Sequence, residues 1–220
     1  MNINHHPNDE LLLDYASGAL REAWSLAIAT HLALCPECRR SVADFEALGG
    51  NILDGIAPEP VSESTFDAVT ASLDKAEGRV ENPPPAAPEV SAQFVLPQPL
   101  RGYLGGDLGD LQWQRLGLGA YQLLIPAGEH GVTARLLRIP AGRPVPTHSH
   151  RGLELTLVLC GAFSDDTGSY GRGDLQEADE SLEHQPHAAP GEDCICLAVT
   201  DAPLRFKSFA ARMVQPLLNI

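Results

Sequence analysis

The segment Ile28–Arg40 contains three side chains of the kind that bind metal ions, His31, Cys35 and Cys38. His31 and Cys35 are four residues apart, so on a helix they lie on one face, one turn apart. Cys38 follows Pro36, a residue that suits the first turn of a new helix. The three side chains can therefore converge where two helices meet. Imidazole and thiolate are ligands that zinc prefers in a tetrahedral arrangement, so the pattern predicts a zinc site with a fourth ligand from elsewhere.

The same cysteines have two other interpretations. A reduced pair near a helix end, or a Cys-x-x-Cys redox pair, would not need the histidine. A thioredoxin-type motif would also need a βαβ context, whereas the flanking sequence has a helical pattern. The in-phase His31 therefore favours metal binding. The nearest spare donors for the fourth position are His5 and His6, and spacing alone does not choose between them.

Length and charge restrict the class of protein. The 220 residues have room for one or two domains, and 15 basic against 29 acidic residues give a formal net charge of -14. This balance argues against a large nucleic-acid interface and is compatible with a basic protein partner. No stretch approaches the roughly 20 apolar residues of a membrane span, and the polar N-terminus does not resemble a secretory signal. Five cysteines without such a signal indicate a reducing compartment, so a cytoplasmic location is predicted.

Residues 8–80 have the apolar periodicity of helices. The predicted helices are Asp9–Leu20, Arg21–Leu34, Pro36–Leu48 and Phe66–Lys75. Asn8 suits the N-cap of the first helix, and Gly49-Gly50 is predicted to end the third. The segment Asn51–Val61 contains a glycine and prolines and is predicted to be a connector. The pattern predicts a small all-α domain over residues 1–80.

Residues 81–99 (ENPPPAAPEVSAQFVLPQP) are predicted to be a linker, because prolines favour extended, unpacked chain. From Tyr103 onward, short apolar runs alternate with Gly, Pro and Asp turns. The predicted strands are Leu111–Leu116, Tyr121–Ile125, Val132–Ile139, Leu153–Leu159, Cys194–Val199 and Leu204–Phe206. Many short strands joined by turns are typical of an antiparallel sandwich or barrel. The predicted fold class is α + β in two domains, with an antiparallel β-barrel or jelly roll over residues 100–220 after the zinc-stabilised helical domain.

A second group of candidate metal ligands, His148, His150 and Glu154, falls in the predicted β domain. In an extended strand the two histidines point to the same face, because side chains alternate. Glu154 has the same parity and joins them if the strand is not broken at Arg151-Gly152. Two imidazoles and a carboxylate on an inner barrel wall suit Zn, Mn, Fe or Ni, and burying these groups without a metal would be costly. The candidates for a fourth donor are His184 and His187.

The spacing Gly142-x5-His148-x-His150-x3-Glu154-x6-Gly161 resembles the first cupin motif. The second cupin motif would begin at Gly173 and place its histidine at residue 184, where this sequence has His184. That stretch departs from the usual pattern, since Asp179, Ser181 and Ala188 replace the expected Pro, Gly and Asn. The resemblance implies a cupin barrel whose metal is held by His148, His150, Glu154 and His184.

The His31-x3-Cys35-x2-Cys38 pattern is similar to the zinc-binding anti-sigma domain. Its combination with a Pro-rich linker and a cupin resembles the ChrR-type anti-sigma factors over most of the chain. The resemblance includes the N-terminal HH pair and the stretches ATHLALC-x-x-C, HRGLELTLVL, DCICLA and TDAPLRF. It implies a first zinc site of His6, His31, Cys35 and Cys38, and two zinc ions per chain.

The resemblance also implies a function. Members of the family bind and inhibit an extracytoplasmic-function sigma factor through the helical domain. The cupin is needed for release under stress, with singlet oxygen (photooxidative stress) as the expected signal. Neither direct nucleic-acid binding nor a membrane association is expected.

A rival interpretation is enzymatic, namely a metal-dependent cupin dioxygenase or isomerase with a helical appendage. Such an enzyme needs an open metal position and acid–base groups nearby. Tyr121 and Glu192 are the available candidates, and the pattern around each favours ordinary barrel wall or surface over an acid–base role. Cys194 and Cys196 share strand parity, so both are expected to face the barrel interior, as packing residues or as a redox pair.

Overall fold

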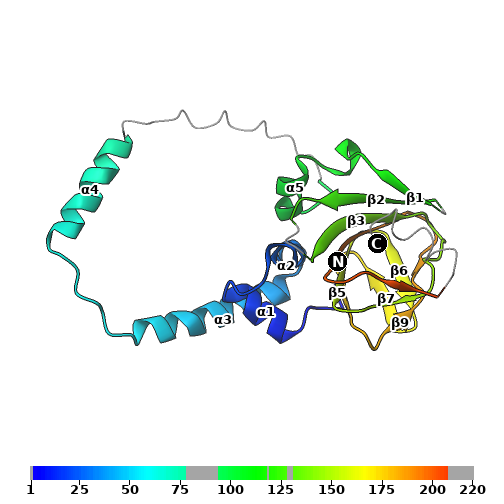
Figure 1. Cartoon of the computed structure of the whole chain (residues 1–220), viewed down its shortest axis with the longest axis horizontal. Helices are drawn as coiled ribbons and strands as arrows, with labels where there is room; N and C mark the ends of the chain where they lie inside the picture. The colour runs from blue at the N-terminus through cyan, green and yellow to red at the C-terminus, as the bar shows by residue number, and fades with distance from the viewer. Residues whose placement is uncertain (1, 78–93, 118, 128–130, 208–220) are drawn as a thin grey trace. The chain divides into compact units, whose positions relative to one another are not determined.

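The computed structural model describes residues 2–77, 94–117, 119–127 and 131–207 (Figure 1). As far as they are described, Met1–Gly49 and Phe94–Ile220 form one compact unit, and Gly50–Gln93 belongs to a second. The first helices of the chain therefore pack with the β domain. Most of the predicted linker lies outside the described residues, and the predicted boundaries at residues 80 and 99 stay a prediction.

The predicted helices are all present, with different ends. Their bounds are α1 Asp9–Ala16, α2 Glu22–Leu34, α3 Pro36–Asp54 and α4 Ser64–Glu77. Asn8 caps α1 as predicted, because its side chain accepts a hydrogen bond from the backbone N–H of Leu11. The helix ends earlier than the predicted Leu20. Gly18 adopts a left-handed backbone (φ 71°), and its N–H bonds to the carbonyl of Tyr15, which closes the last turn.

The prediction that the third helix stops at Gly49-Gly50 was wrong. The helix continues through both glycines to Asp54, and its last turn is closed by bonds from Gly55 and Ile56 to Ile52 and Leu53. A glycine ends a helix when it adopts a positive φ, and neither Gly49 nor Gly50 does so. Both lie on the exposed part of the helix, where glycine weakens a helix without breaking it.

The β domain is a set of antiparallel strands, which confirms the predicted fold class. Its larger sheet contains β1 Gln114–Gly117, β2 Ala120–Ile125, β3 Thr133–Ile139, β11 Cys194–Thr200, β5 Glu154–Cys160 and β8 Leu175–Ala178, in that spatial order. Two three-stranded sheets complete the described part. One contains β10 His187–Ala188, β6 Ala162–Asp165 and β7 Gly168–Gly171, and the other contains β12 Arg205–Phe206, β4 His148–Ser149 and β9 Glu183–His184. Of the two-residue strands, β12 falls within the predicted Leu204–Phe206. The strands β4, β9 and β10 were not predicted, since two residues carry no periodic signal.

The two faces of the larger sheet have different neighbours. On β5, Leu155 and Leu157 belong to the same core cluster as Ile28 of α2, so this outer face is covered by helix. The alternate residue Val158 belongs to a second cluster with Cys196 and other residues of the barrel interior. Alternation of side chains along the strand therefore separates a helix-covered face from a barrel-lining face. Of the metal-ligand candidates of the β domain, His148, His150, Glu154 and His184 are buried, whereas His187 is exposed.

A short helical connection leads into the barrel. It consists of α5 Gln98–Leu104 and a single 3₁₀ turn, η1 Leu108–Asp110. The α5 helix packs on α2, and the hydroxyl of Tyr103 donates a hydrogen bond to Glu22 at 2.8 Å. The carboxylate of Asp107 accepts bonds from the backbone N–H groups of Val95 and Leu96, and these bonds fix the residues just before α5. The connection therefore joins α2 to the chain segment that leads into the barrel.

Candidate metal centres

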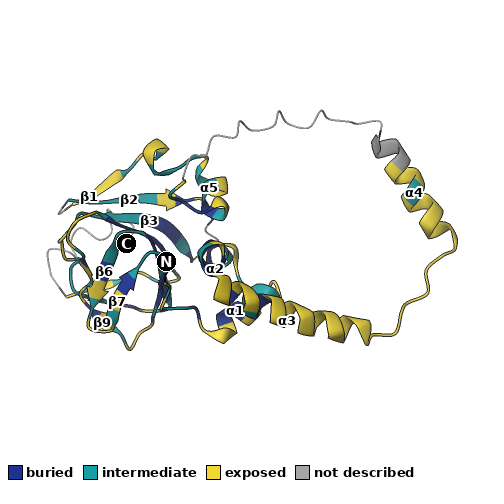
Figure 2. Ribbon diagram, turned by 180° about the vertical axis from the view of Figure 1, so that it is seen from behind, coloured by how far each residue is buried: buried dark blue, intermediate teal, exposed yellow. Residues whose placement is uncertain are grey.

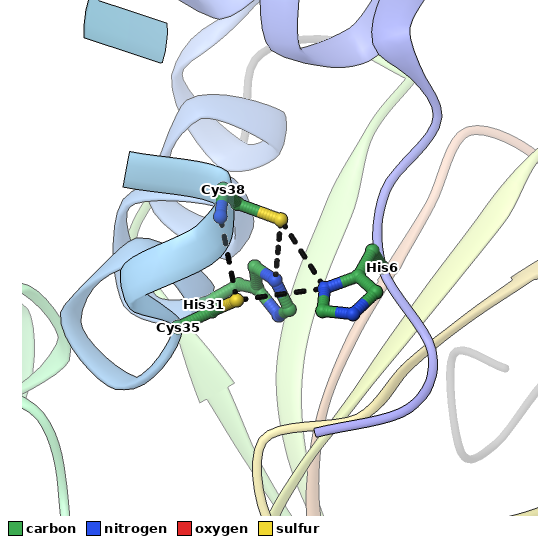
Figure 3. A group of neighbouring side chains, drawn as sticks. All are labelled: His6, His31, Cys35 and Cys38. Atoms are coloured by element: carbon green, nitrogen blue, oxygen red, sulfur yellow. Dashed lines mark hydrogen bonds between the residues drawn. The ribbon is translucent and has the colours of Figure 1, made fainter. Parts of the chain in front are cut away.

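The four candidate ligands near the N-terminus meet in one place (Figure 3). The Nδ1 of His6 lies 3.4 Å from the Sγ of Cys35 and 3.3 Å from the Sγ of Cys38. The Nε2 of His31 lies 3.3 Å from the same Cys38 sulfur. One ligand atom from each residue lies within 4.8 Å of the other three. Two imidazoles and two sulfurs at such distances match the donor set of a closed zinc site.

The junction between α2 and α3 positions three of these side chains. His31 lies in the last turn of α2, and Cys35 is the residue that caps it, its N–H bonded to the carbonyl of His31 at 2.8 Å. Pro36 opens α3, so Cys38 falls in the first turn of that helix. The N–H of Cys38 points at the sulfur of Cys35 at 3.4 Å. Such an N–H stabilises a thiolate at Cys35 once a metal binds.

Burial sets the protonation of the centre. It lowers the pKa of His31 to about 4, an effect only partly opposed by the backbone of Gly173, so the ring is neutral at pH 7 and able to coordinate. Burial, together with the hydrogen bond and charge of Cys35, raises the pKa of Cys38 to about 12. The Cys38 thiol therefore keeps its proton until a cation compensates the negative charge of its thiolate, and a divalent metal supplies that compensation. The donor set fits zinc.

The structure distinguishes the two N-terminal histidines. His6 belongs to the cluster, and its other ring nitrogen, Nε2, lies 3.8 Å from Glu37. His5 lies outside the cluster, with its ring centroid 4.2 Å from that of Tyr170 in β7. Successive side chains of an extended segment point in opposite directions, which explains why only one of the pair reaches the sulfurs.

A second cluster lies in the barrel, where the Nε2 atoms of three histidines lie close together. The Nε2 of His184 lies 3.0 Å from that of His148 and 3.2 Å from that of His150. Register explains the meeting, because β4 pairs with β9 and sets His148 opposite His184. All three rings are buried. Burial lowers the pKa of His148 to about 4, which keeps this ring neutral and available as a ligand.

In two of these histidines the other ring nitrogen, Nδ1, makes a hydrogen bond that fixes the orientation of the ring. The Nδ1 of His148 donates to the carbonyl of Pro146 at 2.9 Å, and that of His184 donates to Asp165 at 2.6 Å. With Nδ1 protonated, each Nε2 carries the lone pair that faces the cluster. Burial alone would raise the pKa of Asp165, but bonds from Thr167, Gln176 and His184 outweigh it and lower the value to about 2. A carboxylate behind a histidine is a common support of metal sites.

Sequence reasoning missed Asp165. It is the last residue of β6, and the hydroxyl and the N–H of Thr167 in the following turn bond to its Oδ1. This local pattern reads as an ordinary turn in sequence. Only the pairing of distant strands shows that the other carboxylate oxygen faces His184.

The remaining candidates lie around the cluster. Glu154 begins β5, with its Oε2 3.8 Å from the Nδ1 of His150 and its Oε1 accepting a bond from Thr156 at 2.9 Å. It is not among the three residues whose ligand atoms lie within 4.8 Å of one another, and its role as a ligand stays a prediction. His187 is exposed and its Nδ1 bonds to the carbonyl of Gln185, outside the cluster.

The barrel interior holds further polar groups that sequence reasoning did not single out. Arg135 of β3 is buried and donates to Gln122 at 2.9 Å. Burial lowers its pKa, and the negative charge of Glu154 acts in the opposite direction. Cys194 and Cys196 both face the interior as expected, with their sulfurs 3.5 Å apart. The hydrogen bond from Cys194, followed by burial, raises the pKa of Cys196, so the Cys196 thiol is protonated in this environment.

The chain is similar over most of its length to known proteins. Residues 104–203 match the domain family described as ChrR Cupin-like domain. The whole chain is 49% identical over 220 residues to the anti-sigma-E factor ChrR of Cereibacter sphaeroides, and the alignment covers 100% of both proteins. It also matches a chain in the crystal structure of Rhodobacter sphaeroides SigE in complex with the anti-sigma ChrR. That match has a TM-score of 0.75 and 46% identity, and covers 91% of this chain and 100% of that chain. The chain, with its helical and its barrel clusters of metal-ligand residues, thus belongs to the ChrR family of anti-sigma factors.

Proposed function

We propose that this protein is an anti-sigma factor that binds and inhibits an extracytoplasmic-function sigma factor through its metal-containing helical domain. The proposal rests first on the similarity to a ChrR that was crystallised in complex with SigE. The observation within this chain that carries it is the apolar surface left uncovered on two helices, α3 and α4 (Figure 2).

On α4, three large apolar side chains follow helical spacing. Phe66, Val69 and Leu73 fall on one side of the helix, and Phe66 is 74% exposed. A helix with an uncovered apolar stripe is typical of the helix-in-groove mode of protein recognition. This stripe is therefore a candidate contact with the sigma factor.

The C-terminal half of α3 has a similar surface. Leu48, Ile52 and Leu53 are all more than half exposed, whereas the first turns of the helix bury Cys38 and Val42. One helix thus carries a metal ligand at its start and uncovered apolar side chains at its end. Apolar patches of this kind on a soluble protein commonly mark interaction sites.

Charge supports the same class of partner. The net charge of -14 disfavours direct binding to nucleic acid and suits a protein whose surfaces normally face it. A bound anti-sigma factor of this charge would keep the sigma factor from core RNA polymerase. Sigma factors act in the cytoplasm, so we infer that this protein acts there too. Within the described ranges, no helix is long and apolar enough to cross a membrane.

The two clusters are proposed to hold one zinc ion each. In the helical domain, His6, His31, Cys35 and Cys38 would be the ligands, and the metal would hold the α2–α3 junction to the N-terminal segment. In the barrel, His148, His150, Glu154 and His184 would be the ligands. The barrel centre would be needed for release of the sigma factor under stress, with singlet oxygen as the expected signal. Cleavage of the chain between the two parts is one route to that release.

A regulatory role is favoured over a cupin enzyme. The relative with 49% identity over the full length is named as a regulator. The acid–base candidates of the enzymatic interpretation contact residues other than the clustered histidines. Glu192 accepts a bond from the Cys160 thiol, and the ring of Tyr121 lies 6.0 Å from the guanidinium groups of Arg115 and Arg138.

Reconstituted transcription tests the proposal. Core RNA polymerase of the host is combined with each of its extracytoplasmic-function sigma factors and the zinc-loaded full chain. We expect one sigma factor to lose promoter-dependent transcription and to co-elute with the chain on gel filtration. A matched reaction with the host's primary sigma factor should be unaffected. A folded, zinc-loaded chain that inhibits none of them would overturn the proposal, and oxygen-dependent turnover by the barrel would then be assayed.

A further inference from the structure

The first residues of the chain lie along strand β8 of the barrel, although 170 positions separate Asn4 from Asp174. The buried carboxylate of Asp174 accepts bonds from the N–H of Asn4 at 2.6 Å and of His5 at 2.9 Å through one oxygen. Its other oxygen accepts a bond from the N–H of Gly171 at 2.8 Å. The N–H of Leu175 in turn donates to the carbonyl of His5 at 3.1 Å. The segment is thus fastened to the edge strand of the larger sheet.

A second attachment lies four residues further along. The two oxygens of Glu177 accept bonds from the N–H of Asn8 at 2.7 Å and from its side-chain amide at 2.8 Å. The remaining side-chain oxygen of Asn8 caps α1 by accepting a bond from Leu11 at 2.9 Å. Glu177 therefore fixes the point at which the segment becomes helix.

His6 lies between these two attachments. Residues 2–8 contain no helix or strand of their own. A terminal segment without such structure is poorly ordered unless it is tied down, and ordering it on metal binding costs conformational entropy. Attachments made beforehand remove that cost from the binding step. The ring of His5 against Tyr170 adds a contact on the same side.

We propose that Asp174 and Glu177 are positioning residues for His6. They hold the backbone on both sides of this histidine, so that its Nδ1 reaches the sulfurs of Cys35 and Cys38. The helical metal centre is then completed by the barrel rather than by the helices alone. The inference rests on the metal centre of the proposed function and is independent of the protein partner.

The test is a metal titration of the full chain carrying Asp174→Asn. Co²⁺ is the probe, because sulfur-to-cobalt charge-transfer absorption reports the thiolate centre, whereas the proposed barrel ligands are nitrogen and oxygen. Zn²⁺ affinity follows from displacement of the Co²⁺. We expect about 10- to 100-fold weaker binding at the thiolate centre, as for loss of other residues that support ligands. Amide hydrogen exchange of residues 4–8 should become faster.

Asp193→Asn is the matched control. Asp193 also accepts a bond from a distant backbone N–H, that of Ala141. Its carboxylate pairs with Arg138, at a place in the described structure that is separate from the attachments of residues 4–8. Its substitution should leave Co²⁺ binding unchanged. Glu177→Gln is the second variant, and it decides the question if Asp174→Asn does not fold, because Glu177 is only partly buried.

A double-mutant cycle separates positioning from general support. In a His6→Ala background, Asp174→Asn should weaken Co²⁺ binding no further, because the side chain that it positions is gone. The same additional loss in that background would overturn the inference, as would wild-type affinity in both Asp174→Asn and Glu177→Gln. At saturating Zn²⁺ the Asp174→Asn chain should still inhibit the sigma factor. If the wild-type chain inhibits no sigma factor, the proposed function fails while the metal titration still decides this inference.

Discussion

Asp165 and His184 are joined by a hydrogen bond of 2.6 Å between two nearly inaccessible side chains. The carboxylate also accepts a bond from Gln176 at 2.8 Å, which orients it toward the histidine. The histidine can then present only its other nitrogen to the cluster. This pair therefore links the end of β6 to the candidate metal centre of the barrel.

We expect Asp165→Asn to weaken metal binding at the barrel about 10- to 100-fold, because the amide no longer holds His184 in one tautomer and orientation. The thiolate centre should keep its metal. Zinc content after dialysis against a graded chelator measures the effect. Asp166→Asn is the matched control, since Asp166 is the adjacent and exposed carboxylate. Equal zinc retention by the two variants would show that Asp165 does not support the centre.

Replacement of both Cys35 and Cys38 by alanine should abolish inhibition of the sigma factor. The change removes two of the four ligands, and zinc content should fall by about one per chain, as a closed four-ligand site requires. Transcription by the reconstituted holoenzyme and metal analysis of the same sample provide the measurement. Cys160→Ala is the control, because that thiol bonds to Glu192 away from both centres. Full inhibition by the double variant at normal protein level would remove zinc from the mechanism.

The uncovered stripe of α4 gives a third prediction. Phe66→Asp and Leu73→Asp should each weaken binding of the sigma factor about 30-fold or more, the effect of losing about 2 kcal/mol at an interface hot spot. Isothermal titration with the purified sigma factor measures the change. Ala71→Asp introduces the same charge on the other side of the helix and should have little effect. If all three variants bind alike, α4 does not contact the partner.

A fourth prediction separates inhibition from release. The full chain with His148→Ala and His150→Ala should still inhibit the sigma factor, because these residues lie outside the helical centre. It should fail to release the sigma factor when cells generate singlet oxygen. A reporter from a sigma-dependent promoter, read before and after illumination with a photosensitiser, measures both properties. His187→Ala alters an exposed histidine outside the cluster and should respond as wild type. Normal induction in the double variant would mean that the barrel metal is not part of the sensor.

The sequence was most informative where ligands are close together. The spacing of His31, Cys35 and Cys38 follows from helix geometry, and the structure brings all three to the α2–α3 junction. His148 and His150 follow from strand alternation in the same way. Longer-range partners came only from resemblance, which selected His6 over His5 and His184 over His187. The clusters contain the selected residues in both cases.

Other features could not be predicted, for physical reasons. Asp165, Asp174 and Glu177 act on residues that strand pairing brings close, and a single sequence contains no record of that pairing. The end of α3 was misplaced because the stop signal of glycine depends on its φ angle, which composition does not reveal. Short strands such as β4 and β9 depend on pairing rather than on periodicity.

The fastening of residues 4–8 to β8 also bears on how proteins of this design can be recombined. A chimera joined at the Pro-rich segment would keep both halves intact in sequence and yet place a foreign barrel beneath the first eight residues. In three dimensions those residues are part of the barrel's edge, although they precede all the helices. A graft that transfers the barrel to a new helical module should therefore carry the N-terminal segment with it.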